Sequence, residues 1–175
     1  PLAGLEQDET SGLSWSPLSN TLFTVTGRIP KLVELSLDGE VLRVVELRGF
    51  SDPEGVEVLS DGRIAIIDER RGQLVLFYLP LDAQFIDAAA LTPLSLGSKA
   101  GSNKGFEGVA WDARQQRMLF AKERSPFGLF SLPFPELAND LAPVVSVLEE
   151  LPSKQIFMRD FSSLAIDQRT GHLLV

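Results

Sequence analysis

The stretch Glu54-Gly55-Val56-Glu57-Val58 decides how the whole sequence is interpreted, because the chain repeats it. The three other copies are Ser11-Gly12-Leu13-Ser14-Trp15, Glu107-Gly108-Val109-Ala110-Trp111 and Ser162-Ser163-Leu164-Ala165-Ile166. Counted from the second residue of each copy, the spacings are 43, 53 and 55 residues. Self-similarity at such a period indicates a repeat architecture.

Every copy is followed by a turn and then by a second short apolar segment, which begins 9 or 10 residues after the second residue of the copy. The second segments are 22–26, 64–68, 118–122 and 172–175. Third segments follow at 31–35, 73–77 and 129–132, and fourth segments at 41–47 and, less clearly, at 84–88 and 144–148. Four short strands in each unit are typical of a β-propeller blade.

The repeat therefore predicts an all-β fold, a β-propeller built from four-stranded antiparallel blades. A β-sandwich also joins short strands by turns, but it gives no reason for self-similarity at this period. We expect one propeller domain over residues 1–175, with blades near 9–50, 51–103, 104–158 and 159–175. About three and a half blades cannot close a ring, so we expect the domain to be incomplete.

Composition excludes several kinds of function. The net charge is −8, with 16 basic against 24 acidic residues, so nucleic acid is not expected as a partner. The absence of cysteine excludes thiol catalysis and zinc–thiolate sites. No apolar run approaches the length of a membrane span, so none is predicted within this chain.

Acidic residues recur at one end of the predicted blades. In an antiparallel blade, the segment leading into strand one and the turn between strands two and three lie at the same end. Strand one is innermost, so Glu54 and Glu107 should point toward the central channel, with Glu69 and Glu123 one layer further out. Asp160 should join them from the following blade.

Converging carboxylates suit a hard cation such as calcium, which takes six to eight oxygen ligands. The predicted calcium ligands are Glu54, Glu107, Glu69, Glu123 and Asp160. The remaining polar residues predicted to face a ligand at this end are Asp52, Asp68, Arg70 and Arg124.

A structural interpretation of the same residues stays open. The glutamates could cap backbone amides of the adjacent blade, and the Glu-Arg pairs could form salt bridges between blades. The matching positions of Trp15 and Trp111 predict packing between blades. His172, the single histidine, begins a predicted strand and gives no support for a histidine-based catalytic site.

At these residues the sequence resembles the SdiA-regulated (YjiK-like) family of bacterial β-propellers. The matching stretches are 11–15, 33–43, 49–55, 68–71, 106–110 and 121–124. The resemblance implies a six-bladed propeller in the periplasm or cell envelope, exported or anchored to a membrane. In similar lactonase-like propellers a Glu-Gly dipeptide at the channel mouth supplies a metal ligand, and Glu54-Gly55 and Glu107-Gly108 match that dipeptide.

Two functions are compatible with these observations. The first is a propeller that binds a cation, a small molecule or an envelope protein through its acidic channel face. The alternative is a calcium-dependent hydrolase of the lactonase, esterase or phytase type.

Overall fold

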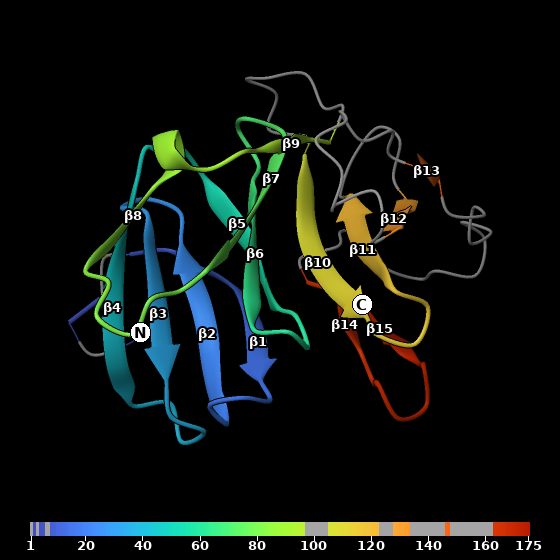
Figure 1. The fold of residues 1–175 in the computed structure, drawn as a ribbon, viewed down its shortest axis with the longest axis horizontal. Coiled ribbons are helices and arrows are strands. Elements are labelled where there is room, and N and C mark those ends of the chain that lie inside the picture. The colour runs from blue at the N-terminus through green and yellow to red at the C-terminus, as the bar shows by residue number, and fades with distance from the viewer. Residues whose placement is uncertain are drawn as a thin grey trace.

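The computed structural model describes residues 2, 4–5, 8–96, 105–122, 128–133, 146–147 and 163–175. These residues form four sheets, coloured in chain order from blue to red in Figure 1. The first sheet contains β1 (Thr10–Ser16), β2 (Thr21–Thr26), β3 (Lys31–Leu35), β4 (Val41–Arg48) and β8 (Phe85–Asp87). The second contains β5 (Pro53–Val58), β6 (Arg63–Asp68), β7 (Gln73–Tyr78) and β9 (Leu94–Ser95). The third contains β10 (Phe106–Asp112), β11 (Arg117–Lys122), β12 (Gly128–Pro133) and β13 (Ser146–Val147), and the fourth β14 (Ala165–Ile166) and β15 (Leu173–Leu174).

The sheets are arranged as the blades of a β-propeller. The first strand of each sheet packs against the first strand of the next, so that β1 contacts β5, β5 contacts β10, and β10 contacts β14. Within each sheet the consecutive strands pair antiparallel and lead outward from that first strand (Figure 1). The predicted fold class is confirmed.

Both faces of the second sheet are buried, which explains the continuous apolar runs in its strands. In β6, Ile64 and Ile66 pack into the core shared with the first sheet. Ala65 and Ile67 of the same strand pack into the core shared with the third sheet. Successive side chains of a strand point to opposite faces, so a strand between two neighbouring sheets is apolar at every position.

The repeat glycines allow neighbouring first strands to approach closely. A Cβ atom at Gly12 would lie 3.0 Å from the backbone nitrogen of Val56. A Cβ atom at Gly55 would lie 3.2 Å from the carbonyl oxygen of Glu107, and one at Gly108 would lie 2.9 Å from the Cβ atom of Leu164. The glycine is therefore required by the packing of one blade on the next.

A β-bulge interrupts the first strand of three sheets near its beginning. The register shifts across Glu54 in β5 and across Glu107 in β10, and between Ser11 and Ser14 in β1. A bulge turns the side chain of its additional residue away from the direction that regular pairing would impose. The two glutamates therefore occupy equivalent positions in neighbouring blades.

The outer part of the second blade differs from the prediction. Residues 84–88 were expected as its fourth strand, but β8 instead pairs parallel with β4 of the first sheet, and β9 takes the outer position beside β7. Contacts with the first sheet explain the position of β8. The Arg43 guanidinium donates to the carbonyl oxygens of Pro80 and Ala83, just before β8. The Arg48 guanidinium lies 3.8 Å above the ring of Phe85 in β8.

A short 3₁₀ helix, η1 (Ala88–Ala90), follows β8, with the Asp87 carboxylate accepting from the Ala89 amide at its N-cap. No helix within the described ranges is long and apolar enough to cross a membrane.

The two tryptophans of the chain do not share one environment, although both were expected to pack between blades. Trp111 is 4% exposed and belongs to the core between the second and third sheets. Trp15 is 53% exposed, and its indole nitrogen donates to Asn20 Oδ1 at 3.3 Å. The prediction is correct for Trp111 and wrong for Trp15, whose side chain stays half exposed.

Candidate functional site

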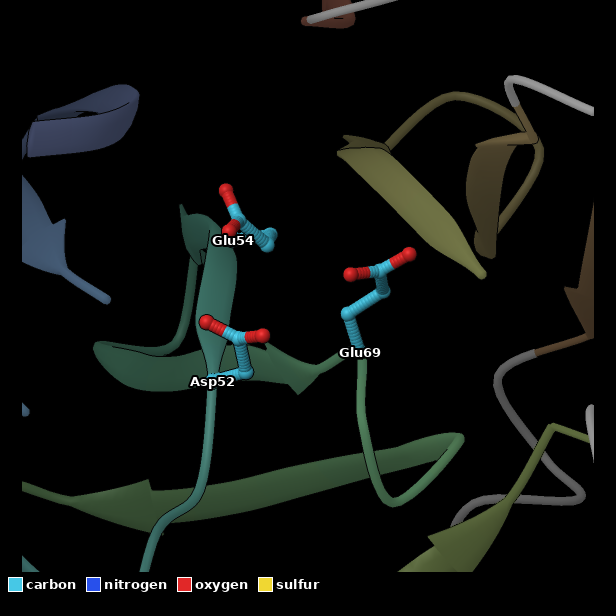
Figure 2. A group of neighbouring side chains, drawn as sticks. All are labelled: Asp52, Glu54 and Glu69. Atoms are coloured by element: carbon cyan, nitrogen blue, oxygen red, sulfur yellow. The ribbon is translucent and has the colours of Figure 1, made fainter. Parts of the chain in front are cut away.

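Three carboxylates of the second sheet come together at the end where β5 begins and β6 ends. Asp52 immediately precedes β5, Glu54 lies in its bulge, and Glu69 immediately follows β6 (Figure 2). One oxygen from each lies within 4.8 Å of the others. We call Asp52, Glu54 and Glu69 the carboxylate cluster.

Backbone contacts hold two members of the cluster side by side. The Glu69 amide donates to the Asp52 carbonyl oxygen at 2.9 Å. The buried Asp68 carboxylate accepts from the backbone amides of Ser51 and Asp52 at 2.8 and 3.1 Å. Asp68 therefore fastens the segment that leads into β5 and takes a structural role.

Glu54 and Glu69 each reach a neighbouring blade. The Ser11 hydroxyl of the first blade donates to Glu54 Oε2 at 2.6 Å. The Gly105 amide, which precedes the third blade, donates to Glu69 Oε1 at 2.9 Å. Glu69 is only 7% exposed, and a Cβ atom at Gly105 would lie 2.4 Å from its Cγ atom. The cluster is thus held by three consecutive blades.

A second glycine leaves space beside the cluster. A Cβ atom at Gly27 would lie 3.2 Å from Asp52 Oδ1 and 3.5 Å from Glu54 Oε1. The other oxygen of each carboxylate is already bound: Arg70 pairs with Asp52 Oδ2 at 3.1 Å, and Ser11 donates to Glu54 Oε2. Any other residue at position 27 would crowd the two oxygens.

The electrostatics of the cluster favour an additional cation. Burial raises the pKa of Glu54, and the charges of Asp52, Glu69 and Glu9 raise it further, against the lowering effect of the Ser11 hydroxyl. Arg70 offsets part of this repulsion through its pair with Asp52 Oδ2, but its side chain is 56% exposed. A hard divalent cation, which prefers carboxylate oxygens, would relieve the repulsion directly.

The structure brings together some of the predicted site residues and separates others. Glu54 in the first strand of the blade and Glu69 just after the second strand do meet in one cluster. Asp52, predicted only to face a ligand, joins them, while Glu107 occupies the equivalent bulge one blade away and is not part of the cluster. Glu123, Arg124 and Asp160 lie outside the described residues.

The structural interpretation also finds support in these contacts. Glu69 does accept from a backbone amide next to the adjoining blade. Arg70 forms an ion pair with Asp52 within one blade. Asp52 could have been assigned to the cluster from the sequence, because it stands two residues before Glu54 and both flank the strand start.

The comparisons with known proteins agree with the fold. A family model described as SdiA-regulated matches residues 1–175. A catalytically inactive virginiamycin B lyase from Staphylococcus aureus, solved with quinupristin, is similar in structure, with a TM-score of 0.57 at 12% sequence identity. That similarity covers 90% of this chain and 45% of the lyase.

A streptogramin B lyase structure is similar to the same degree, with a TM-score of 0.56 at 13% identity over 95% of this chain and 47% of the lyase. The chain thus spans less than half the length of these two propellers. At such identities the similarity concerns the fold alone.

Proposed function

This chain belongs to the SdiA-regulated family of β-propeller proteins, and we propose that it binds a divalent cation, calcium, at the carboxylate cluster. The observation that carries the proposal is the approach of three carboxylate oxygens to within 4.8 Å of one another. Extracellular calcium modules bind with Kd values of about 10⁻⁴–10⁻³ M, the range we expect for a protein of the periplasm or cell envelope.

The side chains around the cluster fit this cation. Asp52 Oδ1 and Glu54 Oε1 border the space that Gly27 leaves, and Glu69 is fixed by its contact with Gly105. Bound calcium would neutralise the carboxylates and join the two segments of the second blade that carry them. These segments also contact the first blade through Ser11 and the start of the third blade through Gly105. We therefore infer a cation that stabilises the packing of the blades and shapes this face for a small molecule or an envelope protein.

The hydrolase alternative has no observation in its favour among the described residues. A calcium-dependent hydrolase needs a base or nucleophile in contact with the substrate. The single histidine, His172, is exposed beside β15 and lies in a different blade from the cluster.

Calcium is expected to raise the melting temperature of the protein, because an ion that binds only the folded state stabilises it. At a calcium concentration of about ten times Kd the linkage amounts to about 1.4 kcal/mol. The Glu54→Gln/Glu69→Gln double variant should lose this rise and keep the wild-type circular dichroism spectrum. Thermal unfolding in calcium and in a chelator measures both.

The matched control removes two carboxylates from exposed positions, as Glu40→Gln/Glu46→Gln. It should retain the response to calcium. Identical melting curves of the wild type in calcium and in chelator, over millimolar concentrations, would show that the cluster is structural and binds no calcium.

Gly105→Ala is expected to weaken calcium binding without changing any charge. The new Cβ atom would lie 2.4 Å from Glu69 Cγ, so the buried glutamate must move away from the cluster. Displacing the support of a metal ligand typically costs about 10–100-fold in affinity. Calorimetric titration with calcium measures the loss, and Gly128→Ala, whose Cβ atom would have no neighbour nearer than 3.7 Å, is the control.

A further inference from the structure

A cavity of about 200 Å³ lies at the opposite end of the first strands from the carboxylate cluster. All four sheets contribute to its wall, through β1, β5, β10, β14 and the turns that follow them. The lining residues that matter below are Leu13, Trp15, Glu57, Trp111, Ile166 and Gln168. Most of the wall is therefore apolar or aromatic.

Glu57 is the only titratable side chain among the described residues that line this cavity. Its Oε1 accepts from the Trp111 amide at 3.0 Å, and its Oε2 accepts from the Ser14 hydroxyl at 2.8 Å. The Ser14 oxygen in turn accepts from the Val58 amide at 2.9 Å, so its proton is directed to Glu57. Both partners of Glu57 are neutral, and no ion pair within the described ranges includes it.

Both tryptophans line the cavity, and their indole nitrogens are bound to other side chains. The Trp111 indole nitrogen donates to Ser60 Oγ at 2.9 Å, and that of Trp15 donates to Asn20. From the fourth blade, the Gln168 side chain accepts from the Ala113 amide and donates to the Trp111 carbonyl oxygen, which fixes the segment that carries Trp111. Indole faces attract cations, tryptophan most strongly of the aromatic residues.

Burial raises the pKa of Glu57 to about 7, against the lowering effects of the Trp111 amide and the Ser14 hydroxyl. The causes of this shift are burial and these two hydrogen bonds, and none of them is a charged side chain. Among the described residues that line the cavity, Glu57 has no charged neighbour. A bound cation would supply the counter-charge of its carboxylate.

We propose that this cavity binds a small organic ammonium ion, whose charged nitrogen pairs with Glu57 and whose apolar body lies against Trp15 and Trp111. The volume sets the size of that body, since a cavity of roughly 150 Å³ accommodates benzene. A primary amine with one ring or a short alkyl chain therefore fits. A single carboxylate with neutral neighbours makes a poor site for a metal ion, and it repels an organic anion.

Fluorescence titration tests the proposal directly, because both tryptophans of this chain line the cavity. The probes are 2-phenylethylamine, its neutral counterpart 2-phenylethanol and the anion 3-phenylpropanoate, each titrated at pH 8. We expect the amine to bind about tenfold or more tightly than the alcohol, and the anion not to bind, since a charge-assisted hydrogen bond favours the cation. Equal affinities for amine and alcohol, or no binding of the amine at millimolar concentrations, would overturn the proposal.

The Glu57→Gln variant should bind the amine no better than the alcohol, while the exposed Glu40→Gln variant should keep the wild-type preference. In the wild type, the affinity for the amine should fall about tenfold for each pH unit below 7, because the protonated carboxyl cannot pair with the ammonium group. This pH profile needs no variant, so it decides the question even if Glu57→Gln does not fold. A flat profile, or a Glu57→Gln variant that retains the preference, would rule out Glu57 as the recognition group.

Discussion

Replacing Glu57 by glutamine should make the protein more stable than the wild type at pH 8, by about 3 kcal/mol, and the difference should shrink to less than about 1 kcal/mol at pH 5. The pKa of Glu57 is about 7 in the folded protein against a model value of 4.5. Between these values the folded state binds more protons than the unfolded state, so wild-type stability falls as the pH rises through this range. One pKa unit corresponds to about 1.4 kcal/mol, which sets the size of the effect.

Urea unfolding of both proteins at pH 5, 6.5 and 8 measures this prediction, with no amine or calcium added. Glutamine keeps the shape of the side chain and its acceptor for the Trp111 amide, so the difference between the two pH profiles isolates the titration. Glu40→Gln, on an exposed turn, is the control and should follow the wild-type profile. If the profiles of Glu57→Gln and the wild type run parallel, Glu57 does not titrate near neutral pH.

Gly108→Ala should destabilise the protein by about 1–3 kcal/mol, the usual cost of an additional methyl group in a well-packed region. Its Cβ atom would lie 2.9 Å from the Cβ atom of Leu164 and 3.0 Å from the backbone nitrogen of that residue. Backbone atoms cannot move aside as a flexible side chain does, so the contact between β10 and the segment leading into β14 must open. The midpoint of denaturant unfolding reports the loss.

Gly128→Ala is the matched control for this prediction. Neither Gly108 nor Gly128 has a positive φ, so backbone strain does not distinguish the two substitutions. A Cβ atom at Gly128 would meet the Phe130 ring no closer than 3.7 Å, an ordinary contact. Equal stabilities of the two alanine variants would mean that the repeat glycine is not required for close packing of the blades.

The fold could be predicted from the sequence because the repeat is a local property of the chain. The spacing of Gly12, Gly55 and Gly108, each followed by a turn and a second strand, is visible without any contact between distant residues. The apolar runs add to this, since a strand such as β6, apolar at every position from Ile64 to Ile67, must be covered on both faces. The propeller follows from these two patterns alone.

The outer strands were harder to predict, because they are held by side chains far away in the sequence. Residues 84–88 look like the fourth strand of their own blade, but β8 lies beside β4 of the preceding blade. Arg43 of that blade binds the loop just before β8, and Arg48 lies over the Phe85 ring. Sequence patterns describe whether a segment can form a strand. They do not describe which edge it will join.

The same distinction applies to the two candidate sites. Strand order placed Glu54 and Glu69 at one end of the blade, and this follows from the sequence because antiparallel strands alternate in direction. Only the tertiary structure leaves Glu107 apart from the cluster, since distances between side chains depend on the direction in which a bulge turns each residue. Glu57 gave no signal in the sequence at all. Its unusual pKa and its place in a cavity arise from burial among four blades, which no single segment of the chain contains.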